Sequence, residues 1–105
     1  MQYTIASEIS VTGLKVTKIA GIVIFTGFFY TANNDIGSGS TLMTINNDSY
    51  KPSYATALTA FAGTRYGNSY SYITAQANTD GTIVIPAGSY SGKGEVRVSG
   101  CWLAS

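Results

Sequence analysis

The pattern of hydrophobic and polar positions predicts short β-strands along almost the whole chain. Near the N-terminus, apolar and polar residues alternate over Ile9–Val11 and Leu14–Val16, and Gly13 between them is expected to form a bulge or turn. Glu95–Trp102 alternates clearly, with the valines on one side and Arg97 on the other. This period of two is typical of strands that bury one face.

One segment departs from this alternation. Ile22–Phe25 and Phe28–Tyr30 are apolar at both odd and even positions. A strand in a one-sided sheet would alternate, so we expect both faces of this strand to be covered. In a thin domain one face meets the core, and we expect a partner subunit to cover the other.

Asn46–Pro52 is a polar corner after a short predicted strand, Thr41–Ile45. Asn and Asp bond their own backbone, and Pro52 restricts Lys51 to an extended conformation. We expect the chain to stop here and cross to another sheet.

The run of small residues at 54–62 follows, and its Ala and Leu content is also compatible with a helix. A strand is favoured because Thr56 and Thr59 are poor helix formers, no helix cap follows the proline, and the neighbouring segments are strands. Its small side chains would allow close sheet packing.

Further strands follow along the chain. Tyr70 and Tyr72 are expected to share one face of a strand, and a tight turn at Asp80–Gly81 precedes the strand Thr82–Ile85. The total is about seven or eight short strands at spacings of about 8–12 residues. The sequence therefore predicts an all-β fold, a compact antiparallel β-sandwich or barrel.

The length of 105 residues predicts a single domain spanning 1–105. Only 10% of residues are charged, so Ser, Thr, Asn, Gly and Tyr must supply most of the surface. The net charge of +1 and the lack of a basic run argue against nucleic acid or an anionic membrane as partner.

Cellular context is weakly indicated. The longest apolar stretch is too short to insert into a membrane, and no signal peptide is visible. The single cysteine, Cys101, cannot form an intramolecular disulfide, and we expect a small buried side chain there. If Met1 is an expression start, the chain is a piece of a longer protein.

The residue types present argue against an enzyme. There is no histidine, which excludes Ser-His-Asp and Cys-His arrangements. Asp35, Asp48 and Asp80 each lie in a turn-forming segment, where bonding to the local backbone is the expected role. No cluster of His or Cys predicts a metal site, and no cofactor is expected.

Binding is the better-supported activity. Gly63–Tyr72 is rich in Tyr, Ser, Gly and Asn, the residue types of adaptable binding surfaces. Tyrosine rings can stack on sugars, and a guanidinium suits hydroxyls or phosphate. The primary candidates for saccharide contact are Arg65, Tyr66, Asn68 and Tyr70. The alternative is that Tyr70 is a half-buried strand residue and Arg65 is solvated.

Three aromatic residues are secondary candidates: Tyr50 at the corner, Tyr90 in the last loop, and Trp102. The preferred interpretation of Trp102 is that it closes the core or the subunit interface, because it follows the alternating valines of the last strand.

The order of these features resembles the C-terminal head domains of receptor-binding proteins and tail fibres of tailed phages, in particular lactococcal phages of Gram-positive hosts. The resemblance covers about Leu14 to Trp102. It rests on these segments in order: "VTKIAGIVIFTGFF", a Gly/Ser loop, "TLMTI", "YKPS", an Ala/Thr strand, "ANTDGTIVIP" and "GEVRVSGCW".

The resemblance implies a homotrimeric head at the tail tip or baseplate of a virion, assembled in the cytoplasm of the host bacterium. Such a head binds a host cell-wall saccharide or teichoic acid. Residues 1–13 would then be a possible neck or linker, through which other tail or baseplate proteins attach. Two alternatives stay open: a monomeric carbohydrate-binding or adhesin module, and a structural virion domain without a ligand.

Overall fold

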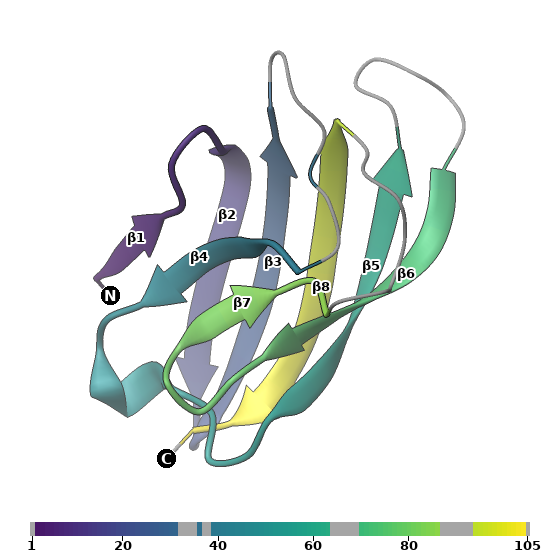
Figure 1. The fold of residues 1–105 in the computed structure, drawn as a ribbon. Coiled ribbons are helices and arrows are strands. Elements are labelled where there is room, and N and C mark those ends of the chain that lie inside the picture. The colour runs from purple at the N-terminus through teal and green to yellow at the C-terminus, as the bar shows by residue number, and fades with distance from the viewer. Residues whose placement is uncertain (1, 32–35, 37–38, 64–69, 87–93, 105) are drawn as a thin grey trace.

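A computed structural model describes residues 2–31, 36, 39–63, 70–86 and 94–104. They form an all-β domain of antiparallel strands, with one 3₁₀ turn, η1 (Asp48–Tyr50), as the helical element in these ranges (Figure 1). The strands are β1 (Tyr3–Ile5), β2 (Ser10–Ile19), β3 (Ile22–Tyr30), β4 (Thr41–Ile45), β5 (Thr56–Gly63), β6 (Tyr70–Ala77), β7 (Thr82–Val84) and β8 (Glu95–Leu103). The predicted fold class is confirmed.

The eight strands form one sheet in the order β1-β4-β7-β6-β5-β8-β3-β2. The sheet curls over, so that β1, β4 and β7 lie across from β2, β3 and β8 (Figure 1). β5, β6 and β7 follow one another as neighbours and β8 returns beside β5, which is a Greek-key arrangement. The result is a nearly closed barrel whose two edges are β1 and β2.

The core lies between these two layers, and the pairing of β3 with β8 forms its largest wall. Every residue of β3 pairs with one of β8, from Ile22 with Leu103 to Tyr30 with Glu95. Inward side chains of the two strands are Val23, Phe25, Phe29, Val96, Val98 and Trp102, all buried. The Phe25 ring lies 5.7 Å from the Trp102 ring and 6.4 Å from the Phe29 ring. These large side chains fill the barrel.

The second face of β3 is not covered within this chain in the way that its inner face is. Ile22 and Ile24 are exposed, while Phe28 and Tyr30 are half-buried. Coverage of this face by a partner subunit therefore stays a prediction. Burial still alternates along β3, because successive side chains of a strand point to opposite faces of the sheet.

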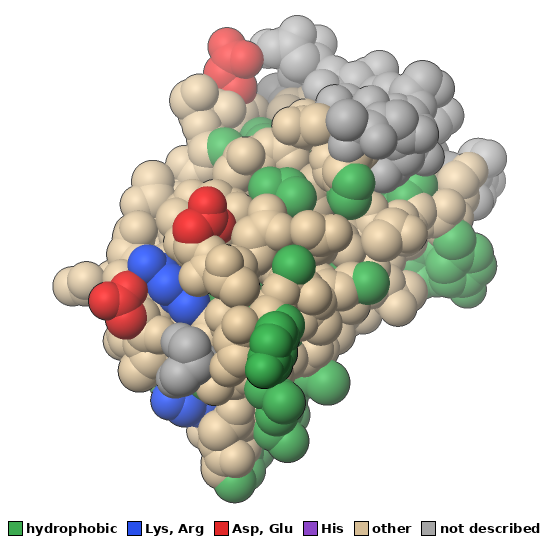
Figure 2. Space-filling model, turned by 60° about the horizontal axis from the view of Figure 1, so that its bottom comes forward, with side chains coloured by type: hydrophobic (Ala, Val, Ile, Leu, Met, Phe, Trp, Pro, Cys, Tyr) green, Lys and Arg blue, Asp and Glu red, His purple; other side chains and the backbone are tan. Residues whose placement is uncertain are grey.

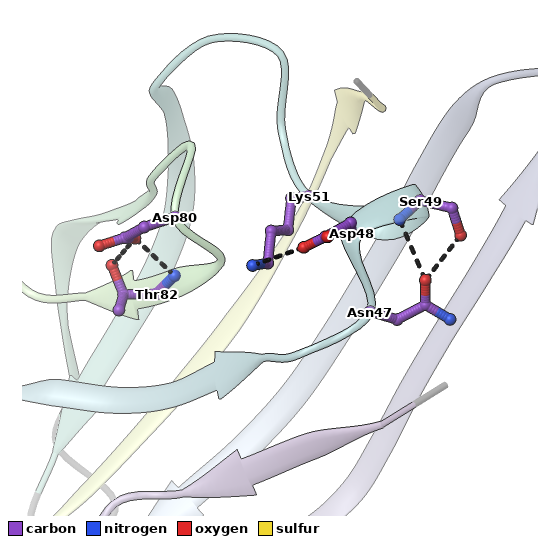
Figure 3. A network of polar contacts seen from close by, with 6 residues as sticks. All are labelled: Asn47, Asp48, Ser49, Lys51, Asp80 and Thr82. Atoms are coloured by element: carbon purple, nitrogen blue, oxygen red, sulfur yellow. Dashed lines mark hydrogen bonds and ion pairs between the residues drawn. The ribbon is translucent and has the colours of Figure 1, made fainter.

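The polar corner connects β4 with β5, which are not neighbours but belong to the same sheet, so the expectation that the chain crosses here to another sheet was wrong. Asn47 Oδ1 accepts hydrogen bonds from the backbone N–H of Ser49 at 3.0 Å and from its hydroxyl at 2.7 Å (Figure 3). The following residues 56–63 form a strand, as predicted, with Ala60 and Ala62 buried. The corner therefore has a structural role, which is to redirect the chain from β4 to β5.

Two further expectations, on residues 1–13 and on Cys101, can be compared with the structure. Within the segment expected as a possible neck, β1 pairs with β4, and Ser10–Thr12 pairs with β3 before a bulge at Gly13. Both strands within that segment thus belong to the sheet, and residues 6–9 connect them. The expectation that Cys101 is buried was wrong: it is exposed, because it pairs with the outward residue Ile24.

Substitution of Gly81, in the turn between β6 and β7, tests how tightly this turn packs against β4. Its φ is +92°, and a Cβ there would collide with the backbone carbonyl of Ile45. We expect Gly81→Ala to lower the free energy of unfolding by about 3 kcal/mol, since strain and overpacking add. Gly21→Ala is the matched control, because Gly21 has φ +83° with nothing within 4 Å of the added Cβ. It should cost only about 1 kcal/mol. Equal losses in urea titrations would contradict this.

Candidate functional site

A shallow groove of about 310 Å³ crosses the outer face of the sheet. β3, β5 and β8 supply most of its walls, and the bulge at Gly13 in β2 closes one side. Its outward side chains are Thr26, Phe28, Thr59, Phe61, Arg97 and Ser99. Since outward residues on neighbouring strands lie side by side, the groove combines aromatic, cationic and hydroxyl groups.

The strand register aligns four of the larger side chains in one row across the sheet. Phe28 pairs with Arg97, Arg97 with Phe61, and Phe61 with Tyr72. The Arg97 guanidinium carbon lies 4.4 Å from the centre of the Phe28 ring. The Phe61 and Tyr72 rings are 4.3 Å apart, tilted by 37°. We call Phe28, Arg97, Phe61 and Tyr72 the aromatic row.

The aromatic row is accessible at its β5–β6 end. Phe61 is 37% exposed and Tyr72 is 75% exposed. Exposing large rings costs hydrophobic free energy, and in a soluble domain such exposure is most informative when the residues are contiguous. The two rings together therefore form an open apolar platform beside a cation.

Glu95 lies two residues before Arg97 on β8 and forms an ion pair with it. Arg97 Nη2 is 3.8 Å from Glu95 Oε1, and the Glu95 side chain is only 5% exposed. Among the described residues, Oε1 has no hydrogen-bond partner. A buried carboxylate needs a compensating charge, so Glu95 restrains Arg97 and offsets its positive charge.

This arrangement is suited to binding a neutral, ring-shaped polar ligand. The aromatic platform can stack on the apolar face of a sugar ring, and the guanidinium donates several hydrogen bonds from one plane. Thr59 and Ser99 pair with each other across β5 and β8, which places two hydroxyl-bearing residues beside the row.

The primary residues predicted from the sequence are only partly placed. Arg65, Tyr66 and Asn68 lie outside the described residues, as does Tyr90. Tyr70 is the first residue of β6, pairs with Gly63, and precedes Tyr72 by two positions. The predicted loop therefore joins the two strands that carry the β5–β6 end of the aromatic row.

The two other secondary candidates, Trp102 and Tyr50, pack within the fold. Trp102 is buried, in agreement with its preferred interpretation as a core residue. Its indole N–H donates to the backbone carbonyl of Tyr50 at 2.8 Å. The Tyr50 ring packs against the core and lies 5.6 Å from Lys18 Nζ. Both residues tie the corner to the barrel.

Sequence reasoning did not select the aromatic row, although part of the signal was present. Period-two alternation placed Arg97 outward, and Tyr72 was assigned to the predicted binding segment. Phe28 was assigned to a covered strand face and Phe61 to a close-packed strand. Their alignment depends on which residue faces which across β3, β8, β5 and β6, and local sequence does not carry that register.

Two of the acidic residues expected in turns, Asp48 and Asp80, have local partners (Figure 3), while Asp35 lies outside the described residues. Asp48 Oδ1 lies 2.8 Å from Lys51 Nζ, and this hydrogen bond and charge lower the pKa of the Asp48 carboxyl. Hydrogen bonds from the hydroxyl and backbone N–H of Thr82 lower the pKa of Asp80. In the part of the chain that the structure describes, no three His, Cys, Asp or Glu residues are grouped to hold a metal ion.

Comparisons with known proteins add no family to this picture. No protein-family model matches the chain, and no curated protein or solved structure matches it. No helix among the residues placed in the structure is long and apolar enough to span a bilayer. The resemblance to phage heads therefore stays a prediction from the sequence.

Asp80 provides a pH-dependent test of the turn. Its folded-state pKa lies below the ordinary 3.8, so ionisation favours the folded state above pH 3.8 and this contribution is lost as pH falls through the folded pKa. We expect Asp80→Asn to reduce the free energy of unfolding at neutral pH. The difference from wild type should shrink in denaturant titrations at progressively lower pH below 3.8. A difference that stays constant with pH would contradict an electrostatic role.

Proposed function

We propose that this chain is an attachment domain that binds a surface saccharide in the groove across β3, β8 and β5 and on the aromatic row that extends from it to β6. The observation that carries the proposal is the aromatic row, in which two exposed rings continue into a guanidinium held by Glu95. Binding sites combine apolar surface with a few oriented polar groups, and this groove does so.

In this proposal the sugar ring stacks on Phe61 and Tyr72. Arg97 donates hydrogen bonds to ring or hydroxyl oxygens, and the hydroxyls of Thr59 and Ser99 bond neighbouring positions. Because shallow grooves bury little of a ligand, each single site would be weak, and several sites acting together would give firm attachment.

The wider proposal follows the sequence resemblance. The domain would be a receptor-binding head of a tailed phage, carried as a homotrimer at the tail tip or baseplate of the virion. It would recognise host cell-wall saccharide or teichoic acid without hydrolysing it, and would join other tail proteins through its N-terminal side. The low charge of 10% supports repeated apolar contacts between subunits.

A monomeric carbohydrate-binding module is the second candidate. In this candidate one copy carries the whole site, since one chain is sufficient to form the groove. The two candidates share the ligand class and differ in assembly, so the mass of the protein in solution separates them.

Tyr72→Ala tests the stacking platform. We expect about tenfold weaker retention on immobilised Gram-positive wall polysaccharide, since an aromatic contact contributes about 0.5–1.5 kcal/mol beyond its area. Tyr3→Ala is the matched control, because Tyr3 is an exposed tyrosine on β1, at the far edge of the sheet. Equal retention of both variants and wild type would remove the groove as the site.

Arg97→Lys tests the planar group separately from its charge. Lysine keeps the positive charge but loses the fork of donors and the flat contact over Phe28. We expect retention on the same polysaccharide to fall by about tenfold, on the order of the 1.4 kcal/mol of one good charged hydrogen bond. Unchanged retention at low salt would indicate that charge alone matters at this position.

A further inference from the structure

A second exposed surface lies at the other end of the same sheet face, and it is apolar. We define the apolar band as Ile19, Ile22, Ile24, Tyr54, Cys101 and Leu103, all of them exposed. We propose that copies of this chain associate with one another through the apolar band. The proposal gives a location to the assembly that the proposed function needs, and it stands on different residues from the groove.

The register brings the band together from three strands. Ile19 pairs with Ile22, and Ile22 with Leu103, so that these three form one row across β2, β3 and β8. Ile24 and Cys101 pair in the adjacent row that faces the same way. Ile19 is 59% exposed and Leu103 is 60% exposed, values usual for surface polar residues rather than for aliphatic ones.

The surface of the apolar band is not flat, because it includes a hollow. Ile22, Tyr54, Cys101 and Leu103 line a hollow of about 290 Å³. Ile19, at the end of β2, pairs with Ile22 and so lies next to this hollow. A surface that holds both projecting side chains and a hollow can be complementary to another copy of itself.

The charged side chains at this end lie elsewhere. Lys18 is directed inward, where its Nζ donates to the Ser49 carbonyl at 2.7 Å, and Lys51 pairs with Asp48. Seen from this end, hydrophobic side chains gather toward one side while Lys, Asp and Glu lie toward the other (Figure 2). The band itself carries no charged side chain, although Lys15 of β2 is exposed on the same face, beside Thr26 in the next row. A strongly acidic partner or a nucleic acid would need more positive charge than this one side chain provides.

Size and composition favour a second copy as the occupant. The six side chains expose several hundred Å², approaching the ~800 Å² that each partner contributes to a standard interface. Interfaces between identical subunits are more apolar than other interfaces, with charged residues depleted at their centre. A lipid surface would instead favour a cluster of basic residues beside the band, whereas Lys15 stands there without a second outward lysine among the described residues of β2.

The band leaves the aromatic row of the groove uncovered. The nearest row of the band, Ile24 with Cys101, adjoins Thr26 and Ser99 of the groove, and Phe28 with Arg97 lies one row further along β3 and β8. Copies in contact through their bands can therefore each present the aromatic row. This is the arrangement that multivalent attachment requires.

The experiment measures mass in solution by light scattering, with Cys101 as an internal reporter. Wild type at roughly 100 μM, above the micromolar dissociation constants of weak interfaces, should have a mass of at least twice 11.0 kDa, and three times 11.0 kDa if the assembly is the proposed homotrimer. Ile24→Lys should be monomeric, because it places a charge in the centre of the contact. Thr74→Lys, an exposed outward position on β6 outside the band, should assemble like wild type.

The thiol provides an independent measurement. Cys101 should react with a maleimide about tenfold or more slowly in wild type than in Ile19→Lys, since burial by a second copy protects the thiolate. Ile19 is used because it lies on β2, whereas a lysine at position 24 would pair directly with Cys101 and activate its thiol. Should Ile24→Lys fail to fold by circular dichroism, Leu103→Lys at the end of β8 makes the same test.

A folded wild-type monomer, or an assembly that the lysine variants of the band leave intact, would overturn the proposal. So would a monomer that sediments with neutral phosphatidylcholine vesicles, because the band would then be a membrane contact. Retention of the monomeric variant on wall polysaccharide separates the two proposals, since the groove is intact in it. If the monomeric variant is retained more weakly than wild type but still measurably, both proposals are supported. If wild type binds and the monomeric variant does not bind at all, the proposal that each copy carries an independent groove is overturned.

Discussion

The pairing of β3 with β8 is the constraint on which the other features depend. Because side chains alternate along a strand, this single register directs Phe25, Phe29 and Trp102 inward together. The same register directs Ile24, Cys101 and Arg97 outward. A slip of one residue would expose the core rings and bury a guanidinium, so core packing and surface chemistry are specified by one set of backbone hydrogen bonds.

Both candidate surfaces are consequences of an outer sheet face that is unusually apolar. At one end the exposed groups are aromatic and accompanied by Arg97 and Glu95, while at the other they are mainly aliphatic and carry no charge. Apolar surface left in water lowers solubility and destabilises the isolated chain relative to a bound state. The difference in polarity between the two ends is the physical ground for assigning ligand binding to one and self-association to the other.

The turns and the corner show what local sequence can specify. Asn47 and Asp80 act through bonds to residues two positions away, so their roles follow from a few neighbouring letters. The strand at 56–63 was also predictable, because threonine content and neighbouring strands outweighed the helical tendency of alanine. Cys101 was assigned wrongly, because its small apolar side chain suggested burial while the pairing with Ile24 directs it outward.

The sequence by itself determined the all-β class, the positions of the main turns and the inward valines of the last strand, since these depend on period-two alternation and local backbone preference. It also indicated that β3 carries apolar residues on both faces. Only the tertiary structure decided that Phe28, Arg97, Phe61 and Tyr72 share one row, and that Ile19, Ile24 and Leu103 share one band. The reason is that both groups join strands separated along the chain, and their alignment is set by non-local register rather than by any residue's own neighbours.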